Sequence, residues 1–155
     1  MSIEAFVTAW LGRDPDVQEI AGSRIYPVEL PQGAGLPALT YYRTGQQGMR
    51  SLAGLSGLSR ARLTIDCWAT SYSDAKGLAA AIRGTWANPK LDGYRGQLAG
   101  VFVQTCLCTN EMDLIERPVH GDEAGVKHVA LDFDIVFEDL DSTVFSDREP
   151  YSEPE

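Results

Sequence analysis

A chain of 155 residues predicts one domain, long enough to bury a hydrophobic core without disulfide bonds or metals. Its composition, 44% hydrophobic and 23% charged residues, is typical of a globular protein. The net charge of −9 argues against proteins that hold DNA by its backbone, because that affinity comes from Lys and Arg side chains that neutralise phosphates. An acidic surface remains compatible with DNA that passes without binding.

Cysteine usage and hydropathy restrict the compartment. Three cysteines do not make a disulfide framework, and Cys106 and Cys108 stand two apart on an expected strand without a Cys-x-x-Cys motif. We therefore expect reduced, mostly packed thiols. The first residues lack a signal peptide, and no apolar run approaches the roughly 20 residues that a membrane span needs. We expect a soluble protein made in a cytoplasm, without a membrane partner.

Two helices are predicted at the start of the chain. Residues 2–12 carry apolar side chains at helical spacing, and Ser2 is a suitable N-cap. The apolar face comprises Ile3, Phe6, Val7, Trp10 and Leu11. A second, short helix is expected to start at Asp14, with Pro15 at its first position, and to end at Gly22.

A long loop is predicted between two strands. Prolines and glycines make residues 24–35 irregular, and 36–43 are expected to form a strand. Residues 44–59 contain four glycines and a single charge, that of Arg50, which favours a loop. Apolar residues recur in it at every third position, namely Met49, Leu52, Leu55 and Leu58. Loops of this length are usually functional or disordered, so this one either folds back onto its own core or docks on another chain.

The next strand, 60–70, alternates between an apolar and a polar face. Leu63 and Ile65 belong to the apolar face, which continues through small residues on either side. The opposite face combines charge with an aromatic ring and consists of Arg62, Thr64, Asp66 and Trp68. We expect a neighbouring surface to cover that face in part.

The second half of the chain predicts a helix and two further strands. The helix starts at Ser71 or Ser73 and runs to about Trp86, with a stripe formed by Ala75, Leu78, Ala79, Ile82 and Trp86. Residues 100–109 form a strand, 112–125 a loop and 126–138 the last strand. One face of that last strand is apolar, and the other consists of His128, Ala130, Asp132, Asp134 and Val136.

This order predicts an α+β fold: a two-layer sandwich in which a mainly antiparallel sheet of about four strands is covered by two to three helices. We expect a single domain over 1–138 and an acidic, flexible tail over 139–155, because seven acidic residues fall within the last 18.

Chemistry-bearing motifs are scarce. The chain has no Gly-x-Ser-x-Gly motif and no Gly-Lys-Ser/Thr phosphate loop. Asp132 and Asp134 share a strand face about 7 Å apart, and with Asp66 and His128 they could form a site for a cation. Paired acids on a strand face are more often solvated, so we expect no enzyme, no cofactor and no metal. Two alternatives stay open: a small metal-dependent enzyme that uses this acidic face, and a monomeric protein-binding module.

Several segments together resemble the tail completion family of long-tailed bacteriophages, also called tail terminator or head-to-tail joining proteins. The first are Arg24-Ile25-Tyr26-Pro27, Leu30-Pro31-Gln32-Gly33-Ala34 and Leu36-Pro37-Ala38-Leu39. The similarity continues through residues 51–58, 60–69 and 73–79, and it covers about 3–138. The acidic tail lies outside the family's pattern.

The resemblance implies a structural role rather than catalysis. Members of the family are expected to form a ring, usually hexameric, that caps the tail tube, stops its growth and joins the tail to the head. The implied partners are other copies of the chain, the tail tube protein and a head-completion or connector protein, with DNA passing through the lumen without specific binding. The implied location is the head–tail interface of the virion, assembled in the host cytoplasm.

Two sets of residues are candidates for contacts in such a ring. The predicted loop is expected to reach a neighbouring subunit or the tube through Met49, Arg50, Leu52, Leu55 and Leu58. The polar strand faces are expected to line the lumen or to meet another subunit through Arg62, Asp66, Asp132 and Asp134. Acidic groups in a lumen would repel phosphate and let DNA slide.

Overall fold

The computed structural model describes residues 2–51, 54–115 and 126–139. The helices are α1 (Ile3–Arg13), α2 (Pro15–Ile20) and α3 (Tyr72–Arg83). The strands are β1 (Ile25–Pro27), β2 (Ala38–Ser51), β3 (Gly54–Ala69), β4 (Gly96–Leu98), β5 (Val101–Ile115) and β6 (Lys127–Asp139). They form one sheet in the order β1-β2-β3-β6-β5-β4, in which only the β1–β2 pair is parallel among the described strands.

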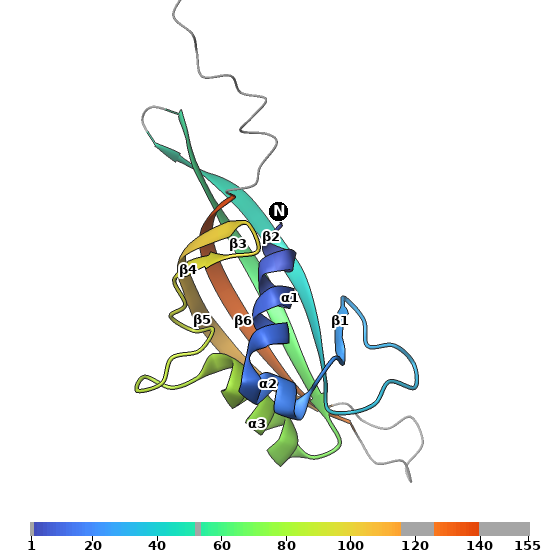
Figure 1. The fold of residues 1–155 in the computed structure, drawn as a ribbon. Coiled ribbons are helices and arrows are strands. Elements are labelled where there is room, and N and C mark those ends of the chain that lie inside the picture. Colours follow the sequence, from blue (N-terminus) through green and yellow to red (C-terminus); the bar gives the residue numbers. More distant parts are fainter. Residues whose placement is uncertain (1, 52–53, 116–125, 140–155) are drawn as a thin grey trace, which may run out of the picture.

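The sheet is strongly curved into a half-barrel, and the three helices lie together against one of its faces (Figure 1). The predicted two-layer α+β sandwich with about four strands is therefore wrong, because the chain is mostly β and its sheet has six strands in the described residues. None of the helices in the described residues is long and apolar enough to cross a membrane.

The largest correction concerns the loop predicted over 44–59. Residues 44–51 continue β2 and residues 54–59 begin β3, so that the two strands make one long antiparallel hairpin. Its register shifts between Arg43 and Gly45 and again between Gly48 and Arg50. Such bulges break the two-residue alternation that reveals a strand in a sequence, and glycines offer no side chain to show it. The short edge strands β1 and β4 carry too little pattern to be predicted.

The local signals at the starts of α1 and α2 are confirmed, whereas α2 ends at Ile20 rather than at Gly22. The hydroxyl of Ser2 accepts a hydrogen bond from the amide of Ala5, as expected of an N-cap. Asp14 caps α2 in the same way through the amide of Val17. Proline at the first position of α2 costs no hydrogen bond, because that amide has no partner inside a helix.

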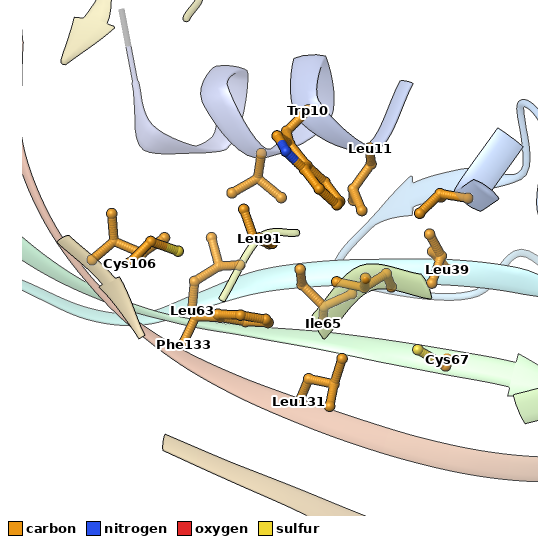
Figure 2. Packing of buried hydrophobic residues seen from close by; sticks show 14 of the residues in the cluster. Trp10, Leu11, Leu39, Leu63, Ile65, Cys67, Leu91, Cys106, Leu131 and Phe133 are labelled. Atoms are coloured by element: carbon orange, nitrogen blue, oxygen red, sulfur yellow. The ribbon is translucent and has the colours of Figure 1, made fainter. Parts of the chain in front are cut away.

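The core lies between the helices and the face of the sheet that they cover. Trp10 and Leu11 of α1 point toward the sheet, where Leu63 of β3 and Phe133 of β6 lie close by (Figure 2). The apolar faces predicted for 60–70 and 126–138 are confirmed: all of these side chains are buried, namely Ala61, Leu63, Ile65, Cys67, Ala69, Val129, Leu131, Phe133, Ile135 and Phe137. Burial on this scale is what stabilises the half-barrel.

The helix predicted to run to Trp86 is shorter than expected. Helix α3 ends at Arg83, and Gly84 follows with a positive φ of 80°. Trp86 therefore leaves the apolar stripe, whereas the other four members of the predicted stripe are buried. Proline at position 89 disfavours helix just before it, but the stop comes earlier, at the glycine.

Ion pairs connect α3 to strand β5. The ammonium group of Lys76 lies 2.9 Å from Glu111 and 2.8 Å from Asp113, and Tyr72 donates a hydrogen bond to the same Asp113 carboxylate. The Lys76 ammonium, and then the Tyr72 hydroxyl, hold the pKa of Asp113 below its usual value. The carboxylates of Asp113 and then Glu111 raise the pKa of Lys76.

Some predictions fall on residues outside the described ranges. These are the candidate contact of Leu52, most of the loop predicted over 112–125, and nearly all of the acidic tail predicted over 139–155.

Candidate functional site

The first candidate region is the far end of the β2–β3 hairpin. Strand β6 pairs with β3 only from Leu58 to Ala69, whereas β2 and β3 stay paired as far as Ser51 and Gly54. In the described part of the chain, residues 49–51 and 54–57 are thus a two-stranded ribbon. Figure 1 shows this ribbon extending away from the rest of the sheet.

The predicted contact residues of the supposed loop fall on both strands of this ribbon or at its base. Met49 and Arg50 lie on β2, and Leu55 and Leu58 lie on β3. Arg50 is the register partner of Leu55 across the hairpin. Four of the five predicted residues are thus brought together by strand pairing, a mechanism that the sequence pattern did not predict.

The second candidate region is the outer face of the sheet, defined as the face opposite the helices. Arg62 of β3 is the register partner of Asp134 on β6, and Thr64 is the partner of Asp132. The Thr64 hydroxyl donates a 2.7 Å hydrogen bond to the Asp132 carboxylate. A further arginine, Arg60, lies 3.4 Å from the Asp134 carboxylate in a partly exposed ion pair. Strand pairing therefore places Arg62, Asp132 and Asp134 on one patch.

The patch borders an open depression of about 370 Å³, whose lining is mostly polar. Its walls include Thr44, Arg62, Thr64, Thr109, Asp132 and Asp134. Small-molecule sites are usually enclosed and mainly apolar, and this depression is neither. Its mixture of carboxylates, hydroxyls and a guanidinium suits contact with another polar surface.

The fourth predicted residue of this face, Asp66, lies in a different environment. It is only 6% exposed, and its carboxylate lies 2.9 Å from Nε2 of His128, which is 7% exposed. The Thr40 hydroxyl donates a 3.4 Å hydrogen bond to the other carboxylate oxygen, and the indole N–H of Trp68 donates to the Thr40 hydroxyl at 2.9 Å. The Trp68 ring also stacks on the His128 ring, with centroids 3.9 Å apart.

We call this set (Thr40, Asp66, Trp68 and His128) the polar cluster. Buried polar groups are tolerated where they are paired, and these contacts link polar groups across β2, β3 and β6. Thr40 is the residue that sequence reasoning missed. No local pattern in the sequence marks Thr40. Its contact with Asp66 follows from the pairing register of β2 and β3, which sets the two residues directly opposite each other.

The described residues contain no group of three His, Cys, Asp or Glu side chains arranged to hold a metal ion. Cys67 and Cys106 are buried on the covered face, and burial raises the pKa of each thiol. Buried thiols of this kind are poor nucleophiles, because the thiolate is the reactive form.

Comparison with known proteins gives one family and one fold. The family model described as tail completion protein gp17 matches residues 5–138. No curated protein matches the chain. A solved structure described as the virion of a native gene transfer agent (GTA) particle contains a chain of similar fold, with a TM-score of 0.62 at 15% identity. That match covers 86% of this chain and 91% of the other.

The family match confirms the resemblance noted in the sequence and covers most of the chain, including the whole hairpin and both candidate regions. It identifies a structural component of the phage tail that is located in the virion and associates there with other phage proteins. This chain belongs to the tail completion protein gp17 family.

Proposed function

We propose that this protein forms a ring, hexameric in the simplest case, that caps the tail tube and joins the tail to the head while DNA passes through its lumen. The observation that carries the proposal is the two-stranded ribbon beyond Leu58. A two-stranded hairpin is at best marginally stable alone in water, so a ribbon that leaves its sheet gains stability from a partner surface. Arg50 and Leu55 pair within that ribbon and are the natural contacts to a neighbouring subunit or to the tube.

The outer face supplies the second part of the proposal. Asp132 and Asp134 lie in a partly exposed patch together with Arg62. Carboxylates on a lumen wall repel phosphate and keep DNA from adhering, which suits a channel that must release its cargo. Asp66 is left out of the proposed lumen wall, because it is buried in the polar cluster and therefore lies away from any surface that DNA would meet.

The proposed partners follow from this position in the particle. They are copies of the same chain, the tail tube protein on one side and a head-completion or connector protein on the other, in a long-tailed phage or a particle derived from one. The domain over 1–138 forms the ring body in this proposal, and the acidic tail over 139–155 is an appendage to it.

The experiment is electron microscopy of tails from particles that lack this chain, with and without the purified protein added back. We expect overlong tails without heads, and we expect added protein to restore normal length and head joining. Tails of normal length that are joined to heads in the absence of the chain would contradict the terminator role.

A charge-reversal variant tests the lumen assignment separately. Replacing Asp132 and Asp134 with Lys is expected to slow DNA passage while the ring still assembles, because Lys attracts phosphate. The matched control is Glu19→Lys. It also reverses the charge of an exposed acidic residue, but this residue lies on α2 and not on the outer face. Normal infectivity of the double variant would contradict the assignment of this face to the lumen.

A further inference from the structure

Trp86 is the most exposed large apolar side chain among the described residues, at 99% exposure. It stands in the connection between α3 and β4. Single exposed apolar residues are common on protein surfaces, but tryptophan is usually well buried. An exposed tryptophan is therefore a candidate contact residue for a partner if the backbone that carries it is held in place.

That backbone is held by several contacts. The amide of Thr85 donates to the carbonyl oxygen of Asn88 at 3.1 Å, and the amide of Asn88 donates back to the Thr85 hydroxyl at 3.1 Å. Gly84 and Pro89 form an isolated antiparallel bridge at the base of the turn. A Cβ atom at Gly84 would stand 2.6 Å from the amide nitrogen of Lys90, so only glycine permits this closure.

The turn is also anchored to the body of the protein. The ammonium group of Lys90 lies 3.1 Å from Asp14 and 2.8 Å from Asp16, at the start of α2. The following amide, of Leu91, donates to the carbonyl oxygen of Ile82 in α3. A tryptophan presented on a pre-organised turn loses little conformational entropy on binding, and such residues are frequent hot spots of interfaces.

The opposite flank of the molecule presents an apolar residue of its own. Val28 follows β1 directly and is 65% exposed, with a φ of +65°. Positive φ is unfavourable for a β-branched residue, and here the Val28 amide is held by a 2.9 Å hydrogen bond to the carbonyl oxygen of Tyr41. A strained, exposed apolar residue that is fixed by its surroundings is a reason to look for function.

The two features lie at opposite ends of the sheet. Strand β1 and strand β4 occupy the two edges of the strand order, and the connections that carry Val28 and Trp86 adjoin them. Figure 1 shows the β1–β2 connection and the α3–β4 connection projecting from opposite sides of the body. A closed ring of one kind of subunit requires this arrangement, in which one patch meets a different patch on the next copy.

Charge is complementary as well. Arg95 ends the connection that carries Trp86, and Glu29 is adjacent to Val28 in sequence. Both are exposed, and neither makes an ion pair with another residue in the described ranges. Opposite charges on the two flanks favour a single orientation of one copy against the next.

We infer that Trp86 of each subunit packs against the Val28 segment of the next copy, and that this contact anchors the interface between subunits. The inference rests on the proposed ring, since a monomeric protein has no such contact. A tryptophan buries about 150–250 Å², well below the roughly 1,200–2,000 Å² of a stable interface, so Trp86 is the anchor of a larger contact.

The first test is Trp86→Ala in the tail-correction assay described above. Loss of this side chain removes no buried surface from the fold, so the melting temperature should not change. We expect at least tenfold more protein to be needed to restore tail length. The matched control is Ala87→Ser, the next residue of the same turn, which should behave as the unaltered chain. Equal activity of Trp86→Ala and the unaltered chain would overturn the inference.

The second test identifies the partner while keeping Trp86 and Val28 intact. Ala87→Cys and Gln32→Cys, at an exposed position of the connection that carries Val28, are combined with Cys108→Ser, and protein assembled on tails is treated with a short bis-maleimide. The native thiols of Cys67 and Cys106 are buried and should not react. We expect a ladder of covalent oligomers that ends at the closed ring, whereas each single-cysteine variant should give no ladder.

The outcomes separate this inference from the proposed function. A ring visible on the tails whose subunits stay monomeric on denaturing gels would overturn the inference and leave the ring standing. A cross-link from the Ala87→Cys single variant to the tube protein would also overturn it, because Trp86 would then face the tube. Tails of normal length without this chain would instead contradict the proposed function itself.

Discussion

The two faces of the half-barrel are built from the same strands but follow different rules. The covered face, which packs against the helices, is apolar along both central strands, with Leu63 and Phe133 as examples. The outer face carries ionisable groups on the alternate positions of those same strands. The apolar core therefore stabilises the fold from one side of the sheet, and the polar side chains of the other side lie outside that core.

The outer face is itself divided in two. At one end the polar cluster is largely buried and its members contact one another, whereas toward the ribbon Asp134 and Arg60 form a partly exposed ion pair. Buried polar groups are costly to disturb and exposed pairs are not. The following predictions test this contrast, beginning with the covered face.

The largest effect is expected from Phe133→Ala on the covered face. The side chain is fully buried in the core, so its removal leaves a cavity as well as lost apolar contact. We expect the free energy of unfolding to fall by about 3–5 kcal/mol, measured by urea denaturation. A loss below about 1 kcal/mol would show that the covered face does not carry the stability assigned to it.

A smaller effect is expected from Thr40→Val in the polar cluster. The change keeps the shape but removes the acceptor of the Trp68 indole N–H and one donor to Asp66. We expect a loss of about 1–3 kcal/mol in the free energy of unfolding, because buried polar groups are left unpaired. The control is Thr105→Val, which changes an exposed threonine on β5 and should change stability little. Equal losses at the two threonines would break the distinction between the buried and exposed parts of the sheet.

The exposed end of the outer face should tolerate the loss of its ion pair. Arg60→Ala removes the partner of Asp134 where both side chains are partly exposed to solvent. We expect a change of about 0–1 kcal/mol in the free energy of unfolding, since water already stabilises both charges. A loss of stability as large as that of Thr40→Val would mean that the Arg60–Asp134 pair is shielded from water as well as the polar cluster is.

The smallest effect concerns pH and the contact between α3 and β5. The pKa of folded Asp113 is lowered by Lys76 and Tyr72, so the ionised carboxylate contributes stability above its unfolded pKa of about 3.9. That contribution is lost as the pH falls through the lower, folded pKa. The melting temperatures of the unaltered chain and of Asp113→Asn should therefore differ slightly at pH 7 and converge in acid. If the two melting temperatures differ as much at pH 2 as at pH 7, the ionised Asp113 carboxylate is not the cause of the difference.

Sequence reasoning succeeded where one physical signal dominates. The alternation over 60–70 and 126–138 predicted the covered face correctly, because burial on one side of a sheet imposes a two-residue period. Capping residues such as Ser2 and Asp14 marked helix starts, because their side chains satisfy free amides locally. These features depend on neighbours in the sequence.

The rest depended on long-range pairing. The sequence predicts a loop over 44–59, whereas residues 44–51 pair with β3, because bulges and glycines conceal the strand periodicity and the pairing depends on a distant segment. The helical spacing of Trp86 predicts a place in the stripe of α3, but the helix ends at Arg83, and Gly84 follows with a positive φ. The link between Thr40 and Asp66 could not be found, because it requires the register between β2 and β3.

A cryo-electron microscopy reconstruction of the head–tail junction of intact particles would test the proposed ring most directly. We expect a ring of this chain at the head-proximal end of the tube. The β2–β3 ribbon should contact a neighbouring subunit or the tube, and Asp132 and Asp134 should face the channel. A ring with the helices toward the channel, or density for this chain elsewhere in the particle, would contradict the proposal.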